Sequence, residues 1–247
     1  MRPRIILVGT KHSGNLGSVA RAMKNFGLDD LVLVAPRCKV DRQAYAMASH
    51  AGDVLDGART VPDTAQALSG CTLVLGTTAR DRASPSYEIL TPRVAAARLP
   101  SQGGAIMFGP EDTGLSNTDL DRCQVAVRIP TAEYASLNLA QAVNVMAYEW
   151  FVRDAAGDEP LDSTQEEPRA APREEFEPMI AQLMETLLYI GYTDELKAGS
   201  VEHMFRRLLD RASPTSREIA ALRGLWSQTH WAANQPVEAL PGRRRTR

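Results

Sequence analysis

The chain has few cysteines, no long apolar run and almost no net charge, and each of these absences excludes a class of protein. Its 247 residues include only Cys38, Cys71 and Cys123, whose spacing fits neither a metal site nor a disulfide framework. No segment approaches the roughly 20 apolar residues of a membrane-spanning helix. A net charge of −2 excludes a uniformly basic binder of nucleic acid. We expect a cytoplasmic protein with reduced thiols and no bound metal.

Strand-like and helix-like patterns alternate through the first 150 residues. Short apolar runs bounded by Gly or Pro predict strands, and apolar residues at three- to four-residue spacing predict helices. The predicted strands are 4–9, 31–34, 73–75, 105–108 and 125–129, and the predicted helices are 18–26, 41–49, 64–68 and 136–151. This alternation predicts an α/β domain over residues 1–153, with a parallel sheet covered by helices on both faces.

The rest of the chain has a different composition. Residues 154–172 hold three prolines and six acidic residues, which predicts a linker. Three helices are expected over 173–235, and together they predict a small all-helical domain. Ser200 is the expected cap of the second helix, and Thr215 with Glu218 forms a capping-box pattern before the third. Residues 236–247 end in an arginine-rich basic tail.

Glycine and polar residues crowd three predicted strand exits, at 9–21, 108–117 and 129–140. In open α/β sheets this edge is where ligands bind. The first segment is not a dinucleotide fingerprint, because it lacks the G-x-G-x-x-G spacing and no ribose-binding acid follows the second strand. We expect its glycines to form a turn before a helix whose free N–H groups bind an anion, with an RNA phosphate as the best candidate.

The third segment contains two residues with an ordinary structural explanation. Ser136 is a natural cap for the long helix, and Asn138 is a common residue in a first helical turn. On composition alone, the structural explanation outweighs a catalytic one for both residues.

Taken together, the three segments resemble the SPOUT superfamily of RNA methyltransferases, specifically its 2′-O-methylating branch. Asn15–Ala22, which reads N-L-G-S-V-A-R-A, is similar to the first motif of that branch. Phe108–Glu111 with Gly114-Leu115 is similar to the second, and Ile129-Pro130 with Ser136–Ala140 is similar to the third. The motifs occur in the right order and span about the first 150 residues.

The resemblance implies a SPOUT-like fold with a deep trefoil knot, and a homodimer in which two subunits share each active site. It implies S-adenosyl-L-methionine as cofactor and RNA, most simply transfer RNA, as partner. The implied reaction is ribose 2′-O-methylation, with cytidine or uridine at anticodon-loop position 32 as the target. A ribosomal RNA target, or a non-catalytic RNA-binding homologue, is the alternative.

The resemblance also assigns residues to the site. The implied catalytic residues are Arg21, Asn15, Ser136 and Asn138. The implied cofactor-binding residues are Thr77, Thr78, Ala79, Gly109, Glu111, Ile129, Ala135, Ser136 and Leu137. Because a guanidinium stays protonated in proteins, we expect Arg21 to hold a phosphate and stabilise the developing alkoxide rather than to act as a base.

Basic residues of the helical domain are the candidates for binding RNA. They are Lys197, Arg206, Arg207, Arg211, Arg217 and Arg223. A solvated helix face is the competing explanation, since Glu202 and Asp210 lie among them in the sequence. We expect RNA contact because an acidic linker precedes these helices and a basic tail follows them.

Overall fold

The computed structural model describes residues 2–79, 88–100, 102–133, 136–155 and 170–235. The chain divides into two compact units, Met1–Glu167 and Pro168–Arg247. Among the described residues, no helix combines the length and apolarity needed to span a bilayer. The basic tail and most of the predicted linker lie outside the described residues.

Unit 1 is built on a sheet whose described strands all run parallel, as predicted. The strand order is β3-β2-β1-β6-β4-β7-β5. The strands are β1 (Arg4–Val8), β2 (Leu31–Val34), β3 (Arg59–Val61), β4 (Leu73–Thr77), β5 (Ile89–Leu90), β6 (Gly104–Phe108) and β7 (Val125–Val127). The sequence analysis missed β3 and β5, which are only three and two residues long and hold no fully buried residue.

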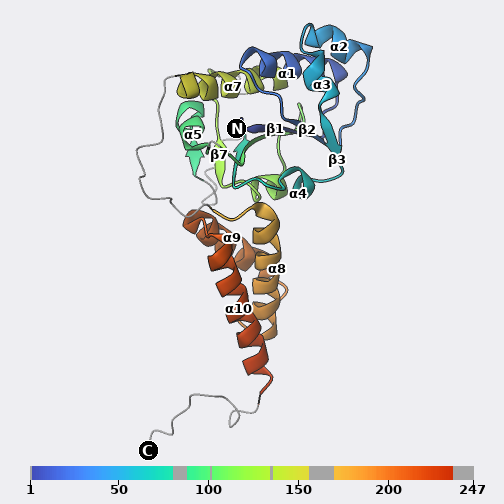
Figure 1. Cartoon of the computed structure of the whole chain (residues 1–247). Coiled ribbons are helices and arrows are strands. Elements are labelled where there is room, and N and C mark those ends of the chain that lie inside the picture. The colour runs from blue at the N-terminus through green and yellow to red at the C-terminus, as the bar shows by residue number, and fades with distance from the viewer. Residues whose placement is uncertain (1, 80–87, 101, 134–135, 156–169, 236–247) are drawn as a thin grey trace, which may run out of the picture. The chain divides into compact units, whose positions relative to one another are not determined.

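Helices cover both faces of the sheet, which confirms the predicted layers (Figure 1). They are α1 (Ser13–Asn25), α2 (Arg42–Ala48), α3 (Gly52–Asp56), α4 (Thr64–Ala67), α5 (Pro92–Arg98), α6 (Asn117–Leu120) and α7 (Leu139–Ala155). Residues of α1, α2, α3, α5 and α7 pack on one face, and residues of α4 and α6 pack on the other.

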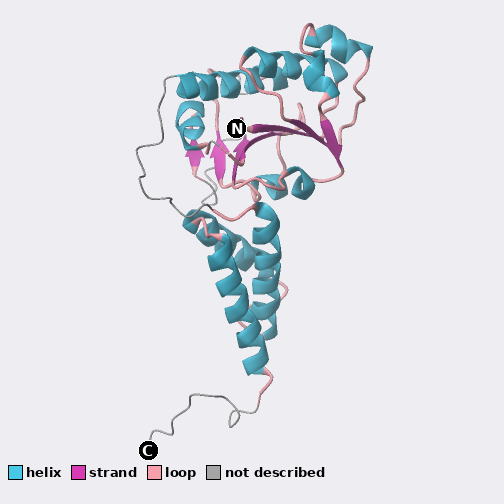
Figure 2. Ribbon diagram, viewed as in Figure 1, coloured by secondary structure: helices cyan, strands magenta, loops and turns pink. Residues whose placement is uncertain are grey.

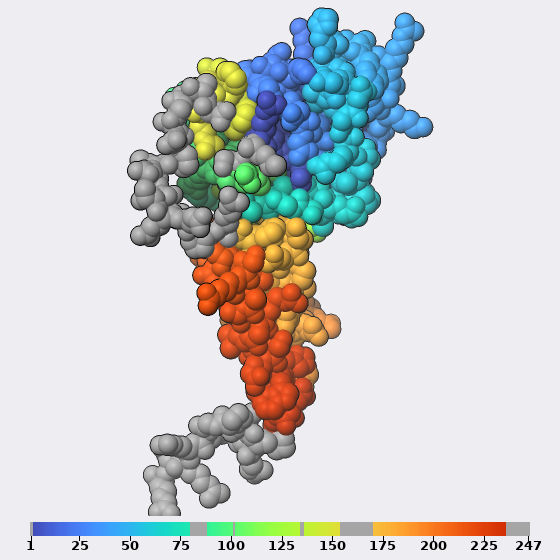
Figure 3. Space-filling model, in the orientation of Figure 1, coloured from blue at the N-terminus to red at the C-terminus, as the bar shows by residue number. Residues whose placement is uncertain are grey.

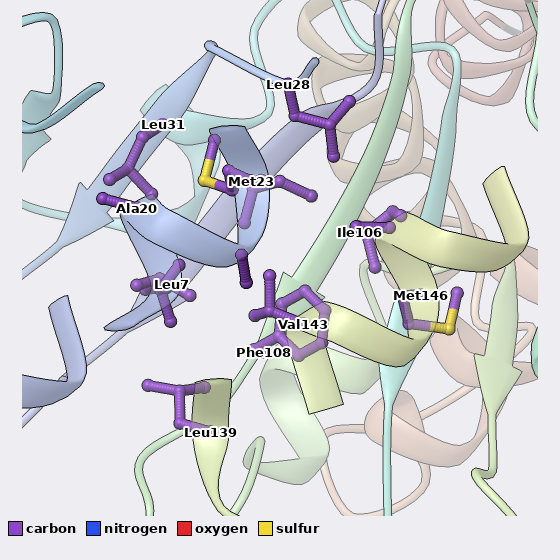
Figure 4. Packing of buried hydrophobic residues seen from close by; sticks show 14 of the residues in the cluster. Leu7, Ala20, Met23, Leu28, Leu31, Ile106, Phe108, Leu139, Val143 and Met146 are labelled. Atoms are coloured by element: carbon purple, nitrogen blue, oxygen red, sulfur yellow. The ribbon is translucent and has the colours of Figure 1, made fainter. Parts of the chain in front are cut away.

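Alternate residues of each central strand enter different cores, as the two-residue period of a strand requires. Ile5 and Leu7 of β1 join the core beneath α1 and α7, whereas Ile6 joins the core on the opposite face. Figure 4 shows the first core, in which Met23 of α1 and Val143 of α7 meet the strands. Burial on both faces explains why the central strands read as continuous apolar runs.

The first helix begins at Ser13, five residues before the predicted start at Ser18. The expected glycine turn is therefore limited to Gly9, where φ is +60°, and Gly14 and Gly17 are helical. At Gly17 an added Cβ would lie 1.9 Å from the carbonyl oxygen of Ala44 in α2. Gly17 thus permits two helices to touch, a tertiary requirement that helix-period analysis cannot detect.

The long helix α7 begins at Leu139, three residues after the predicted cap Ser136. Asn138 performs the capping role, because its side-chain oxygen accepts a 2.9 Å hydrogen bond from the backbone N–H of Ala140. Ser136 is instead an exposed loop residue.

The described residues of unit 2 form a bundle of three helices, as predicted (Figure 2). They are α8 (Arg173–Tyr189), α9 (Ala198–Ala212) and α10 (Ser216–Ala233). The capping box of Thr215 and Glu218 is present at the start of α10. The cap predicted at Ser200 is wrong, because Lys197 precedes α9 and Ser200 lies inside it. Phe176, Met179 and Trp226 are among the residues of the core between the helices.

The trefoil knot stays a prediction. Residues 134–135, in the segment before α7, lie outside the described residues.

Candidate active site

A cavity of about 330 Å³ lies where three neighbouring strands end. Strands β6, β4 and β7 are adjacent and parallel, so their carboxyl ends meet at one edge of the sheet. Each strand exit contributes to the wall of the cavity. The lining comprises Thr77–Ala79 after β4, Phe108–Leu115 after β6, and Val127, Ile129, Ser136, Leu137, Leu139 and Ala142 after or beyond β7.

The loop after β6 folds back on itself so closely that Gly109 must be glycine. An added Cβ at Gly109 would lie 2.1 Å from both the carbonyl carbon of Gly114 and the backbone nitrogen of Leu115. Gly114 has a φ of +66°, and its N–H donates a 2.8 Å hydrogen bond to the carbonyl of Pro110. The resulting wall is made largely of backbone, which offers N–H and C=O groups to a ligand without side-chain bulk.

The structure brings most of the expected cofactor-binding residues together. Eight of them line the cavity: Thr77, Thr78, Ala79, Gly109, Glu111, Ile129, Ser136 and Leu137. Ala135 lies outside the described residues. Sequence reasoning missed Phe108, Pro110, Asp112–Leu115, Val127, Leu139 and Ala142 in the lining. The tight turn after β6 and the later start of α7 account for most of these omissions.

A hydrogen-bond chain connects the three motifs. The Asn15 side-chain amide donates to Glu111 Oε1 at 2.7 Å, and the Asn138 amide donates to Asn15 Oδ1 at 3.2 Å. The backbone N–H of Lys11 donates to Glu111 Oε2 at 3.1 Å. Lys11 and Asp112 form an ion pair beside this chain at 2.5 Å. Residues from the first, second and third motifs therefore position one another.

Glu111 lies against the turn that precedes α1, the helix whose N–H groups the sequence analysis predicted to bind an RNA phosphate. Its carboxylate accepts from the backbone N–H groups of Lys11 and His12, directly before α1. Burial alone would raise the pKa of Glu111, but the hydrogen bonds from Asn15, Lys11 and His12 outweigh burial and hold it below the ordinary value. A carboxylate of the same chain thus accepts from two backbone N–H groups of this turn, whereas phosphate binding by the N–H groups of α1 stays a prediction.

Arg21 does not line the cavity. It lies on α1, its side chain is exposed, and it forms no ion pair with a described residue. The described lining residues include no Lys, Arg or His, and their charged members are Glu111 and Asp112. A single copy of the described chain therefore brings Asn15, Asn138 and the cavity loops together, but does not place Arg21 in the cavity lining.

The basic residues predicted to bind RNA divide into two groups in unit 2. The Arg206 side chain is only 11% exposed, and its guanidinium pairs with Glu177 at 2.9 Å and with Glu202 at 3.1 Å. Arg223 donates from Nε to Gln182 at 2.9 Å, and Lys197 lies 3.9 Å from Asp194. Arg207, Arg211 and Arg217 form no ion pair with a described residue and remain the better candidates.

The sequence of the chain matches models of known protein families. A model of the SpoU rRNA Methylase family matches residues 2–148, which cover all three motifs. The chain belongs to this family. It is therefore a methyltransferase, and the SPOUT resemblance inferred from the sequence is confirmed. A model of the C-terminal domain of the tRNA methyltransferase TrmJ matches residues 174–238.

Individual SpoU methylases resemble the chain over nearly all its length. A Pectobacterium atrosepticum protein named tRNA (cytidine/uridine-2′-O-)-methyltransferase TrmJ is 44% identical over 232 residues, covering 91% of this chain and 95% of that protein. The Salmonella typhimurium protein of the same name is 42% identical, covering 90% and 93%. The crystal structure of TrmJ from Z. mobilis ZM4 is 39% identical with a TM-score of 0.79, covering 92% of this chain and 99% of that one.

Proposed function

We propose that this SpoU methylase transfers a methyl group from S-adenosyl-L-methionine to the ribose 2′-hydroxyl of transfer RNA, at cytidine or uridine 32 of the anticodon loop. The observation that carries the proposal is the match of both units. The relatives named as tRNA (cytidine/uridine-2′-O-)-methyltransferases align over 90% or more of the chain, including the helical unit. A ribosomal RNA target is favoured only by the name of the family that matches residues 2–148.

The cavity residues fit S-adenosyl-L-methionine. The volume of the cavity, about 330 Å³, lies in the range of small-molecule sites. Thr77–Ala79 and Gly109–Leu115 would supply backbone groups to the adenine and ribose, and Leu115, Ile129 and Leu137 would supply apolar contacts. When bound, the cofactor supplies a sulfonium methyl group that a nucleophile can displace. Of the two lining carboxylates, Asp112 is paired with Lys11, so Glu111 contributes the negative charge that favours a cationic ligand at this edge.

The protein must make the ribose hydroxyl a better nucleophile. That hydroxyl has a pKa far above neutral, so the charge that develops on its oxygen during attack requires stabilisation. Arg21 would hold the neighbouring phosphate with its planar guanidinium and stabilise that charge, while a phosphate oxygen or water takes the proton. Asn15, Ser136 and Asn138 would position the ribose and the loops around it.

A homodimer would complete the site. The cavity lining described for one copy has no cationic side chain, whereas Arg21 lies exposed on α1. Helix α7 packs against α1 and exposes Tyr148, Phe151 and Val152, which are 49%, 44% and 39% accessible. Burying these side chains against a second copy would stabilise the dimer and could place Arg21 of one copy at the cavity of the other.

The proposal is tested by mapping ribose methylation. The purified protein is incubated with unmodified tRNA, ribosomal RNA and labelled S-adenosyl-L-methionine, and the products are mapped by mass spectrometry of nuclease fragments. We expect label on a ribose of the tRNA anticodon loop. Label confined to ribosomal RNA would overturn the substrate, and label on a base would overturn the reaction. Cofactor binding without methylation of either RNA would indicate a non-catalytic RNA-binding protein.

A further inference from the structure

The loop that joins β2 to α2 carries three cationic side chains beside the candidate site. We call residues 35–42, which comprise the loop and the first residue of α2, the β2–α2 loop; its basic members are Arg37, Lys39 and Arg42, and its acidic member is Asp41. None of the three basic residues lines the cavity or belongs to the helical unit. Figure 3 shows the blue to light-blue part of the chain, within which this loop falls, at an outer edge of unit 1.

The β2–α2 loop is held against the neighbouring strand exits by its backbone. The N–H of Ala35 donates to the carbonyl of Val61 at the end of β3, at 2.9 Å. The N–H of Arg37 donates to the carbonyl of Thr10, just after β1, at 2.8 Å, and the Cys38 thiol lies 3.4 Å from the same oxygen. Hydrogen bonds to the neighbouring strand exits therefore hold the backbone that carries the cationic side chains.

Ala35 has a φ of +41°, a left-handed conformation that a residue with a Cβ rarely adopts. Such strain persists only where the surrounding structure enforces it, and it concentrates at functional sites. Here it bends the chain at the exit of β2, at the same edge of the sheet as the cavity.

The loop adjoins the segments that form the candidate site. The pKa of Asp112, a cavity-lining residue, is lowered mainly by its hydrogen bond with Lys11 and to a smaller extent by the positive charge of Arg37. Gln43, directly after the loop, lies 3.4 Å from the Ser13 hydroxyl at the start of α1. The loop thus borders both the second motif and the helix that carries Asn15 and Arg21.

The charges of the loop are available to a ligand. The side chains of Arg37, Lys39 and Arg42 are exposed, and none forms an ion pair with a described residue. Asp41 does not neutralise them by an ion pair, because its carboxylate caps α2 by accepting from the N–H groups of Gln43 and Ala44 at 2.9 and 3.1 Å. In contrast, Arg2, Arg59 and Arg98 of unit 1 each form an ion pair with an acidic side chain.

We propose that the β2–α2 loop binds the phosphate backbone of the RNA strand next to the target nucleotide. The inference rests on the proposed function and adds a second RNA contact to it, on unit 1. Exposed and unpaired cations fit phosphates by charge, and they contact the backbone without reading the bases. The loop would hold the substrate in register while Arg21 and the cavity act on one ribose.

The test compares two triple variants of the full-length protein with equal loss of charge. R37A/K39A/R42A removes the loop cations, and R2A/R59A/R98A removes three arginines that are paired with Asp29, Asp30 and Glu88. Binding of unmodified tRNA is measured over a range of salt concentrations, together with the affinity for S-adenosyl-L-methionine as a check on folding. Arg37→Lys combined with Arg42→Lys retains the charge and provides a rescue variant.

Removing one cation that binds a phosphate should reduce the slope of log affinity against log salt by about 0.7 to 0.9. We expect the slope to fall by roughly 2 for the loop variant and to stay unchanged for the matched variant and the lysine rescue, with cofactor affinity unaltered. Equal slopes for the two triple variants would overturn this inference and leave the proposed function standing. Failure of the unaltered protein to bind tRNA would overturn both.

Discussion

The side-chain amide of Asn15 donates a 2.7 Å hydrogen bond to the carboxylate of Glu111, across 96 residues of sequence. The same carboxylate accepts from backbone N–H groups before α1, and Asn15 accepts in turn from Asn138. One acidic side chain therefore connects the three motifs, and the geometry of the candidate site depends on its ionised form.

Glu111→Gln should destabilise the fold in a pH-dependent way. The new amide would present N–H groups to donors that need an acceptor, which costs about 1–3 kcal/mol at neutral pH. The folded pKa of Glu111 is lowered, so its stabilisation is complete above the ordinary value of 4.5 and disappears as pH falls through the folded pKa. Denaturant unfolding of both proteins at several pH values should show a difference that shrinks in acid. A difference independent of pH would contradict this role.

Gly109→Ala should abolish or strongly weaken cofactor binding. A Cβ at 2.1 Å from Gly114 and Leu115 forces the loop after β6 to open, and that loop forms a wall of the cavity. We expect the affinity for S-adenosyl-L-methionine, measured by calorimetry, to fall by about tenfold or more, which is 1.4 kcal/mol or more. Gly52→Ala is the control, since its Cβ would meet only ordinary contacts at 3.6 Å or beyond. Wild-type affinity in Gly109→Ala would refute the location of the site.

Two glycines of α1 should respond differently to the same substitution. Gly17→Ala places a Cβ 1.9 Å from the Ala44 carbonyl and should lower the free energy of unfolding by roughly 1–3 kcal/mol. At Gly14 the nearest atom is the end of the flexible Gln43 side chain at 3.3 Å, so Gly14→Ala should cost little. Chemical denaturation measures both. Equal stabilities would mean that the contact between α1 and α2 is looser than described.

Arg206 and Arg207 are neighbours in sequence with different expected roles. Arg206→Ala breaks a largely buried ion pair with Glu177 and should destabilise unit 2 by about 3 kcal/mol. Arg207→Ala should leave stability unchanged but reduce the salt dependence of tRNA binding by about 0.7 to 0.9 in slope. Thermal unfolding and binding titrations separate the two effects. A stable Arg206→Ala variant with a reduced slope would reverse the assignment.

Arg21→Lys retains the positive charge of Arg21 but removes its planar fork of donors. If Arg21 orients a phosphate through paired hydrogen bonds, the single-turnover rate of methyl transfer should fall by about tenfold or more, a barrier increase of at least 1.4 kcal/mol. The affinity for S-adenosyl-L-methionine should not change, because Arg21 does not line the cavity. A near wild-type rate would show that charge alone is sufficient.

Local patterns predicted the parts of this fold that local chemistry determines. The apolar central strands, the helix after residue 41 and the capping box of Thr215 all appear as expected. The sequence analysis failed where distant segments meet. Gly17 was read as part of a turn because its partner, Ala44, is a tertiary neighbour.

The candidate site shows the same division. The three strand exits were identifiable because parallel strands place their carboxyl ends at one edge. That Glu111 would fill the anion position before α1 could not be inferred from either motif alone, since its partners are about 100 residues away. The ion pair of Arg206 with Glu177 could not be read from the sequence, because the two residues lie on different helices; RNA binding by Arg206 stays a prediction. Recognition of the ordered motifs supplied the chemistry that composition could not.

The most direct test of the account is a crystal structure with S-adenosyl-L-homocysteine, the demethylated product. We predict the product in the cavity formed after β4, β6 and β7, against Thr77–Ala79 and Gly109–Leu115, with the guanidinium of Arg21 from a second copy facing it. Product bound at any other place on the protein, or no binding in solution or crystal, would contradict the central claim that these strand exits form the methyl-donor site.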